Sequence, residues 1–274
     1  MPELPEVETI VRCLRRPLRG RKVLRARLRP VALYRRGSLR VGSLVGRTVA
    51  GVERAGKNAV FRFDPPGIMV VNLGMTGQLL LYPSCGRALE TPRKHLHGRF
   101  YLDDGSELRY YDPRRFGFIF VAPPCDISLA LGIGPDPFDA KPRDLANALA
   151  KRDAAIKPLL LDQRILSGIG NIYADETLFD ARIDPRTPGL RVASSAARLL
   201  ASARRILKSA IAHRGSTIRD YRRPDGSRGG FQDLHAVYGR EGEPCVCCGK
   251  AIVKIVLSGR GTHFCPSCQS WTGA

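Results

Sequence analysis

Four cysteines near the end of the chain are spaced as metal ligands. They form two pairs, Cys245-x2-Cys248 and Cys265-x2-Cys268, separated by sixteen residues. Each Cys-x-x-Cys turn brings two sulfurs together, and four thiolates close a tetrahedral zinc site with no open coordination position. We therefore expect one structural Zn²⁺. The neighbouring Cys247 leaves an alternative open, in which it replaces one member of the first pair.

The segment between the two cysteine pairs has the pattern of a β-hairpin. Ile252–Leu257 is a strand-like run, and Ser258–Thr262 forms the expected tip with Arg260 between two glycines. An arginine at such a tip, on a chain of net charge +20, favours a polyanionic partner. The alternative is a zinc hairpin that only stabilises the fold.

A second group that could carry chemistry stands at the N-terminus, which begins Met1-Pro2-Glu3. Methionine before proline is normally removed, and this would expose the secondary amine of Pro2. An α-amine has a pKa of about 7.7–8.0, so part of it is neutral at physiological pH and can attack a sugar C1′ or a carbonyl. Glu3 could then serve as a general acid or base. The alternative is that Pro2 and Glu3 merely cap the helix that follows.

The charge balance agrees with a phosphate-rich partner. The 274 residues include 45 Lys and Arg against 25 Asp and Glu. A membrane role is disfavoured, because the sequence has neither a run of eighteen apolar residues nor a basic amphipathic helix with aromatic anchors. The acidic start at Met1–Glu6 does not resemble a secretory signal. We expect a protein of the reducing cytoplasm.

Hydrophobic periodicity indicates the elements that must position these groups. Residues 5–16 have the stripe of one helix, with Pro17 at its expected end. From Val23 to about Val121 short β-rich runs alternate with turn residues, as in an antiparallel sandwich. Later segments have helical patterns. The expected strands are 48–52, 60–63, 68–73, 78–82, 99–102, 108–111 and 118–121, and the expected helices are 143–150, 156–161, 171–180 and 195–213.

These patterns predict an α+β protein with a long N-terminal helix on an antiparallel β-sandwich, followed by a helical region and a zinc hairpin. The proline-rich stretch after Val121 suggests an interdomain linker. The expected division is a β-sandwich domain over residues 1–125, a linker over 126–142, a helical domain over 143–238 and a zinc-finger hairpin over 239–274.

Several motifs along the chain resemble those of bacterial formamidopyrimidine-DNA glycosylase, which removes oxidised purines from DNA. The chain starts with Met-Pro-Glu-Leu-Pro-Glu-Val-Glu-Thr and ends with the zinc hairpin that carries Arg260. Between these ends lie five further matching motifs, which are Leu-Gly-Met-Thr-Gly (73–77), Asp-Pro-Arg-Arg-Phe-Gly (112–117), Gly-Ile-Gly-Asn-Ile-Tyr-Ala (168–174), Gly-Ser-Thr-Ile-Arg-Asp-Tyr (215–221) and Val-Tyr-Gly-Arg-Glu-Gly (237–242).

The resemblance implies a bifunctional DNA glycosylase and AP lyase, whose helical domain over 143–238 binds DNA through a helix–two-turn–helix element. Pro2 would form an imine with the deoxyribose C1′ while the damaged base leaves, Glu3 would donate the proton at the sugar ring oxygen, and Glu6 would support both. Lys57 and Arg260 would contact the flanking phosphates and assist the β- and δ-eliminations that follow. The zinc would be structural, the protein a monomer, and its partner duplex DNA with oxidised purines or abasic sites, met at the bacterial nucleoid.

The same resemblance implies the remaining contacts with DNA. A base inside a duplex is reached only by flipping it out, and the side chains at 75, 114 and 116 would fill the hole left in the stack. The implied DNA-binding residues are Asn72, Met75, Arg114, Phe116, Asn171, Tyr238 and Arg260. The implied pocket for the flipped base consists of Ser216, Thr217, Ile218, Arg219, Asp220 and Tyr221. Members of the family commonly have histidine where this chain has Asn72, so this phosphate contact would lack a charge.

Two alternatives remain at this point. An enzyme of the endonuclease VIII type prefers oxidised pyrimidines and shares Pro2, Glu3, the lysine and the zinc hairpin, but Leu4 and the segments 75–77 and 216–221 favour the purine enzyme. The other alternative is an inactive DNA-binding paralogue, which the occupied catalytic positions disfavour.

Overall fold

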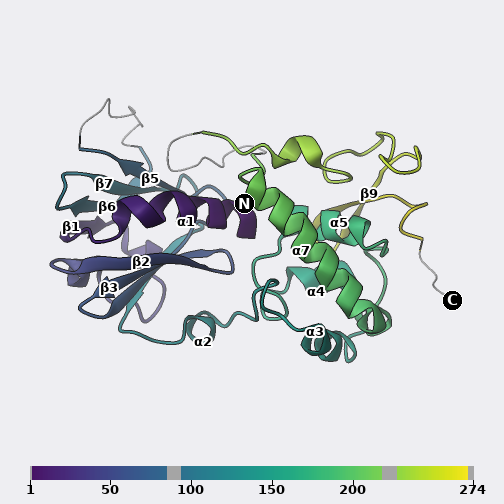
Figure 1. Cartoon of the computed structure of the whole chain (residues 1–274), viewed down its shortest axis with the longest axis horizontal. Coiled ribbons are helices and arrows are strands. Elements are labelled where there is room, and N and C mark those ends of the chain that lie inside the picture. Colours follow the sequence, from purple (N-terminus) through teal and green to yellow (C-terminus); the bar gives the residue numbers. More distant parts are fainter. Residues whose placement is uncertain (1, 85–93, 218–226, 271–274) are drawn as a thin grey trace. The chain divides into compact units, whose positions relative to one another are not determined.

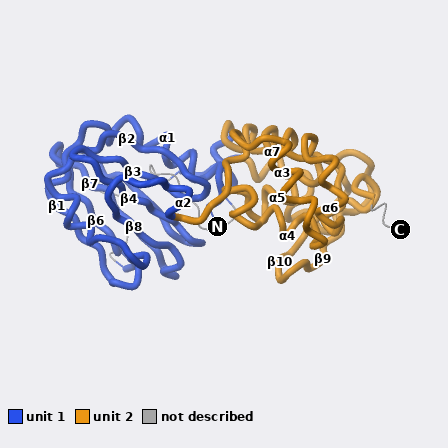
Figure 2. The backbone as a smooth tube through the Cα atoms, turned by 90° about the horizontal axis from the view of Figure 1, so that it is seen from below, with its two compact units in different colours: residues 1–130, 213–230 blue, residues 131–212, 231–274 orange. Residues whose placement is uncertain are grey.

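The computed structural model describes residues 2–84, 94–217 and 227–270, and it divides the chain into two compact units (Figures 1 and 2). Unit 1 consists of residues 1–130 and 213–230, and unit 2 of residues 131–212 and 231–274. The segment 213–230 therefore returns to the first unit after the long helix of the second, which no sequence pattern had indicated. The four-segment division stays a prediction.

Unit 1 is the expected antiparallel β-sandwich. Its two four-stranded sheets have the strand orders β1-β6-β7-β5 and β2-β3-β4-β8. Apolar side chains from both sheets and from helix α1 (Leu4–Leu18) form one shared core. The strands are β1 Val23–Leu28, β2 Thr48–Ala55, β3 Asn58–Asp64, β4 Gly67–Asn72, β5 Gln78–Tyr82, β6 Leu96–Leu102, β7 Glu107–Tyr111 and β8 Phe118–Ala122, with the 3₁₀ turns η1 Val31–Leu33 and η2 Val41–Leu44.

Helix α1 forms because its apolar residues recur every three or four positions and face the sandwich. Val7, Ile10, Val11 and Leu14 are almost wholly buried, and the helix packs against β2 and β3 (Figure 1). The expectation that Pro17 ends it was wrong by one residue, since the helix continues to Leu18. A proline in the last turn forfeits a single backbone hydrogen bond, which the buried stripe outweighs.

Unit 2 is helical. Helix α5 packs between α4 and α7, and α3 packs on α7, whose buried stripe includes Leu199, Ala203 and Leu207. The helices are α3 Pro142–Leu149, α4 Ile156–Leu161, α5 Asn171–Asp180, α6 Gly189–Val192 and α7 Ala196–Ala212, with the 3₁₀ turns η3 Ala193–Ser195 and η4 Phe231–Leu234. A further short helix, α2 (Ile127–Leu131), lies inside the segment predicted as a linker.

Strands β9 (Val253–Leu257) and β10 (Arg260–Phe264) form the expected hairpin, and Arg260 pairs with Leu257 at its tip. Ser258 and Gly259 both have positive φ, as a tight two-residue turn requires. A small core of Phe179, Val237, Ile252 and buried cysteines attaches the hairpin region to helix α5. The α+β class is thus confirmed, and no helix in the described parts of the chain is long and apolar enough to cross a bilayer.

Candidate functional site

The start of helix α1 buries two carboxylates beside Pro2. Pro2 itself is buried, and Glu3 and Glu6 are only 2% and 1% exposed. Glu3 is the N-cap, and its backbone N–H donates to Glu6 Oε2 at 2.8 Å, which satisfies one of the free N–H groups of the first turn. Pro5 costs nothing here, because its position needs no N–H donor. The local sequence therefore fixes Glu6 directly behind the N-terminal residues.

The second oxygen of Glu6 holds the segment that begins the predicted base pocket. The backbone N–H of Ser216 donates to Glu6 Oε1 at 2.7 Å. Gly215 has a φ of +79°, and a Cβ on it would come within 2.6 Å of the same carboxylate oxygen. Thr217 accepts a hydrogen bond from the backbone N–H of Gly229. The structure thus joins Ser216 and Thr217 to the helix start, whereas Ile218, Arg219, Asp220 and Tyr221 lie outside the described residues.

Lys57 lies in the tight turn between β2 and β3, after Gly56 with a φ of +56°. Asn72 lies across from Asn58 on the neighbouring strand, and its side-chain amide donates to Asn58 Oδ1 at 2.9 Å. The side-chain oxygen Oδ1 of Asn72 accepts the backbone N–H of Gly74. Asn72 thus uses both ends of its amide to hold the turn that follows β4, a structural task that the sequence did not reveal.

Met75, Arg114 and Phe116 lie on two adjoining loops of unit 1. Met75 is 38% exposed and Phe116 61% exposed, which is unusual for large apolar side chains. The guanidinium of Arg114 lies 5.6 Å from the centre of the Phe116 ring. A Cβ on Gly74, in the first loop, would come within 2.5 Å of the backbone of Phe116, so the loops touch through their main chains. The structure therefore brings this predicted set together and leaves it facing solvent.

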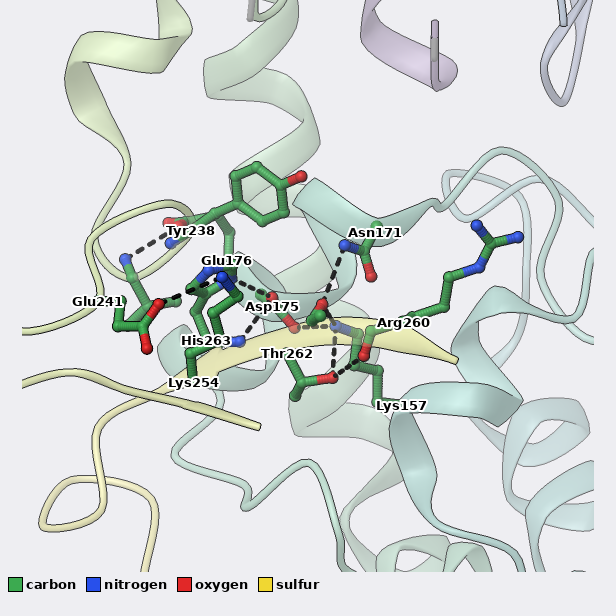
Figure 3. A network of polar contacts seen from close by, with 12 residues as sticks. Lys157, Asn171, Asp175, Glu176, Tyr238, Glu241, Lys254, Arg260, Thr262 and His263 are labelled. Atoms are coloured by element: carbon green, nitrogen blue, oxygen red, sulfur yellow. Dashed lines mark hydrogen bonds and ion pairs between the residues drawn. The ribbon is translucent and has the colours of Figure 1, made fainter. Parts of the chain in front are cut away.

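In unit 2, Asn171 and Arg260 are linked through the hairpin tip. Asn171 begins helix α5 after Gly170, and its side-chain amide donates to the carbonyl of Gly261 at 3.0 Å. Figure 3 shows the Arg260 side chain extending away from the polar network beneath it. Arg260 is exposed, whereas Thr262 is fully buried. Asn171 thus binds the backbone of the hairpin tip, and the exposed guanidinium of Arg260 projects from the residue next to that contact.

A buried ion pair supports the segments that carry Asn171 and Arg260. It joins Lys157 to Asp175 at 2.7 Å, and both side chains are 0% exposed. The Lys157 ammonium also donates to the Gly261 carbonyl at 2.8 Å and to Thr262 Oγ1 at 2.9 Å. Asp175 accepts the backbone N–H of His263 (Figure 3). The ion pair and these hydrogen bonds fix the tip of the hairpin to helix α4 and helix α5.

Tyr238 is held by a second buried carboxylate. Glu176 accepts the backbone N–H groups of Ala236, Val237 and Tyr238 at 2.8–3.0 Å. Burial raises the pKa of Glu176, and the three N–H groups oppose this rise. The Tyr238 ring packs edge-on against His263, with 5.1 Å between ring centres. Helix α5 therefore supports both segments: Glu176 binds the backbone at Tyr238, and Asp175 binds strand β10 at His263.

The four predicted zinc ligands come together. The sulfurs of Cys245, Cys248, Cys265 and Cys268 all lie within 4.8 Å of one another, with 3.5 Å between Cys248 and Cys265 and 3.9 Å between Cys245 and Cys268. Zn–S bonds of roughly 2.3 Å in a tetrahedron would require about 3.8 Å. Burial and neighbouring sulfurs raise the pKa of Cys268 to about 12, so four thiolates need a cation among them. The residues fit Zn²⁺.

Cys247 does not belong to this cluster. It is exposed, and its sulfur accepts a hydrogen bond from Arg182 at 3.2 Å. Its backbone N–H donates to the Cys245 sulfur. Among the described residues the metal-binding set is therefore the one with x2 spacing in both pairs.

Sequence reasoning missed the buried charged residues that support the site. These are Lys157, Asp175 and Glu176 in unit 2, together with Asp112 in unit 1. One signal was available, because Lys157 stands in the apolar run Ile156–Leu161, where a charge must either leave the core or find a partner.

Comparisons with known proteins cover nearly the whole chain. Three family models match: the formamidopyrimidine-DNA glycosylase N-terminal domain over residues 1–119, the H2TH domain of the same enzyme over residues 131–222, and a zinc finger found in FPG and IleRS over residues 242–270. A formamidopyrimidine-DNA glycosylase from Symbiobacterium thermophilum is 42% identical, with 98% of this chain and 89% of the relative covered. One from Thermus thermophilus is 43% identical, with 98% of each chain covered.

Solved structures agree with this relationship. The crystal structure of MutM (Fpg) from Thermus thermophilus has a TM-score of 0.86 and 42% identity, with 98% of both chains covered. Lactococcus lactis Fpg with abasic-site DNA has a TM-score of 0.87 and 35% identity, covering 98% of this chain and 100% of that one. The same values hold for Lactococcus lactis Fpg with DNA containing an oxidised pyrimidine. The chain belongs to the formamidopyrimidine-DNA glycosylase family.

Proposed function

We propose that the chain is a bifunctional DNA glycosylase and AP lyase that removes oxidised purines, 8-oxoguanine and formamidopyrimidines, from duplex DNA. The observation that carries this proposal is the buried helix start, where one carboxylate, Glu6, binds both the residue after Pro2 and the first residue of the base-pocket segment. Glu6 thereby links the proposed acid Glu3, which directly follows Pro2, to the start of the proposed pocket segment within unit 1.

The first step uses the amine of Pro2 after removal of Met1. Its nitrogen attacks the deoxyribose C1′, the bond from C1′ to the base nitrogen breaks, and the sugar ring opens as its oxygen takes a proton from Glu3. The amine proton passes to the departing base, which leaves as a neutral molecule, and the product is a cationic imine between the Pro2 nitrogen and C1′. Glu6 is already occupied by two backbone N–H groups, so its role is to hold Glu3 and the pocket segment rather than to exchange protons.

The lyase steps follow from the imine. The imine makes the hydrogen at C2′ acidic, so its loss expels the 3′ phosphate, and a second elimination expels the 5′ phosphate. Lys57 and Arg260 assist these two departures by contact with the phosphates. The support for Arg260 is its exposed position on a rigid hairpin tip beside Asn171. In this proposal Tyr238 contacts a further phosphate of the DNA backbone, and Asn72 contacts another through the second N–H of the amide that binds Asn58.

The positive net charge of the chain suits a DNA partner. A net charge of +20 supplies non-specific attraction to duplex DNA, which steers the protein toward its substrate. The four-cysteine cluster would hold one Zn²⁺, which stabilises the hairpin that carries Arg260 and has no free position for a substrate. We also propose that the protein acts as a monomer in the cytoplasm, where it meets DNA at the nucleoid.

A second candidate substrate class has specific support. A relative, Lactococcus lactis Fpg, has been solved with DNA that contains an oxidised pyrimidine. We therefore include oxidised pyrimidines as secondary substrates, with oxidised purines preferred.

The test compares duplexes with 8-oxoguanine opposite cytosine and duplexes with thymine glycol, with borohydride present to trap the imine. We expect faster excision of 8-oxoguanine and a covalent protein–DNA product. The Pro2→Gly variant should lose excision while it keeps most of its affinity for DNA. A wild-type protein that binds lesion DNA but yields no trapped product would refute the enzymatic proposal. Faster excision of thymine glycol would refute the purine preference.

A further inference from the structure

A fully buried carboxylate lies between the two loops that carry Met75, Arg114 and Phe116. Asp112 is 0% exposed. Its Oδ1 accepts the hydroxyl of Thr76 at 2.6 Å, and its Oδ2 accepts the backbone N–H of Gly117 at 2.9 Å and the hydroxyl of Tyr110 at 3.2 Å. We call these four residues the Asp112 cluster. Both oxygens of the carboxylate are used, and they join loop 73–77 to loop 112–117.

Each exposed side chain stands next to an atom that this cluster fixes. Met75 precedes Thr76, and Phe116 precedes Gly117. Arg114 is held directly, because its backbone N–H donates to Thr76 Oγ1 at 3.3 Å. The Thr76 hydroxyl of loop 73–77 therefore binds loop 112–117 twice: it accepts the backbone N–H of Arg114 and donates to the carboxylate of Asp112. One hydroxyl and one carboxylate thus set the relative positions of all three side chains.

Close backbone contact leaves the loops little freedom. A Cβ on Gly117 would come within 2.2 Å of the Tyr110 hydroxyl oxygen and 2.3 Å of the Asn72 carbonyl oxygen. Burial and the charge of Asp112 raise the pKa of Tyr110, so its hydroxyl stays protonated and remains a donor. Two exposed apolar side chains are thereby presented by a rigid base, whereas loops of similar length usually adapt.

We propose that Thr76 and Asp112 are positioning residues, which hold Met75, Arg114 and Phe116 in register as one unit that enters the base stack when a lesion is flipped out. This inference rests on the proposed function. Insertion between bases requires side chains whose spacing is set before binding, because a misplacement of about 1 Å can cost on the order of 100-fold in rate. The cluster supplies this spacing without touching DNA.

The test is Thr76→Val, which keeps the shape of the side chain and removes the bridging hydroxyl. Two substrates are compared: a duplex with 8-oxoguanine, whose stack must be filled, and a single strand with an abasic site, which has no such stack. We expect duplex excision to slow by roughly 10- to 100-fold and single-strand cleavage to change less than about twofold. Thr76→Ser restores the hydroxyl and should restore duplex excision.

A matched control exists in the same unit. The Ser106 hydroxyl donates to Asp104 Oδ1 at 2.6 Å and is equally buried, but it lies in the turn between β6 and β7. Ser106→Ala should leave both substrates unaffected. If Thr76→Val does not fold, Tyr110→Phe removes a different donor of the same carboxylate and is compared in the same way.

Equal loss on both substrates, or no loss on the duplex, would overturn the proposal, since the cluster would then be a stabilising contact only. Failure of Thr76→Ser to recover duplex excision would overturn it as well. A wild-type protein that is inactive on both substrates would instead refute the proposed function.

Discussion

Removal of the buried lysine in unit 2 should be far more costly than removal of an exposed one. Lys157→Met leaves the Asp175 carboxylate without its 2.7 Å partner in a site where both side chains are 0% exposed. It also removes two hydrogen bonds to the hairpin tip, at 2.8 and 2.9 Å. Breaking one side of a buried ion pair costs about 3–5 kcal/mol. The expected loss in free energy of unfolding of unit 2 is of this size.

The assay is equilibrium unfolding in urea, followed by the helical circular dichroism signal. With an m-value of roughly 2 kcal/mol/M, the expected loss moves the urea midpoint down by roughly 1.5–2.5 M. The matched control is Lys254→Met. Lys254 pairs with Glu241 at 3.2 Å, but the two side chains are 44% and 58% exposed, and such pairs contribute less than about 1 kcal/mol.

The double variant Lys157→Met/Asp175→Leu separates pairing from packing. Because it leaves no uncompensated buried charge, its cost should fall well below the sum of the two single variants. Additive costs, or a loss below about 1 kcal/mol for Lys157→Met, would refute the reasoning that this pair fixes the hairpin tip to helices α4 and α5.

Three further outcomes follow from the same structure. Arg260→Ala should reduce the slope of the logarithm of the binding constant against the logarithm of salt concentration by about 0.9, which corresponds to the loss of one phosphate contact. An unchanged slope would show that Arg260 makes no contact with a DNA phosphate. Chelation of zinc should unfold the hairpin region, where metal binding contributes roughly 10–16 kcal/mol in comparable peptides, and leave the β-sandwich of unit 1 folded; melting of both would contradict this. Burial lowers the pKa of His235 to about 4, whereas the pKa of histidine in the unfolded chain is about 6.5. Protonation of His235 therefore favours unfolding. The stability of unit 2 should fall by at most about 3 kcal/mol as the pH drops from about 6.5 to about 4. His235→Phe should remove this part of the pH dependence, and an unaltered pH profile would contradict the assignment.

The local elements could be predicted because their signals are local. Helices 156–161 and 171–180 and strand 78–82 match the structure at both ends, since turn residues flank clear hydrophobic patterns. The zinc cluster follows from cysteine spacing alone. Other predicted ends differ from the observed ends by a few residues. Strand β2, for example, continues to Ala55 rather than ending at Val52, because its pairing with β3 extends past the apolar run.

The supports of the site could not be predicted, because they depend on contacts between distant residues. Lys157 meets Thr262 across 105 positions, and Asp112 meets Thr76 across 36. Asn72 resembles a weakened phosphate contact in the sequence, yet its amide holds the turn that begins loop 73–77. A charge or amide in an apolar pattern indicates that a partner exists, but only the fold identifies that partner.

In the proposed mechanism the amine of Pro2 forms the bond to the damaged sugar. The most direct measurement is mass spectrometry of the protein after borohydride trapping on 8-oxoguanine duplex and proteolysis. We expect the DNA adduct on the N-terminal peptide, which starts at Pro2 without Met1. An adduct on an internal lysine such as Lys57, or full activity of a protein that retains Met1, would contradict the account.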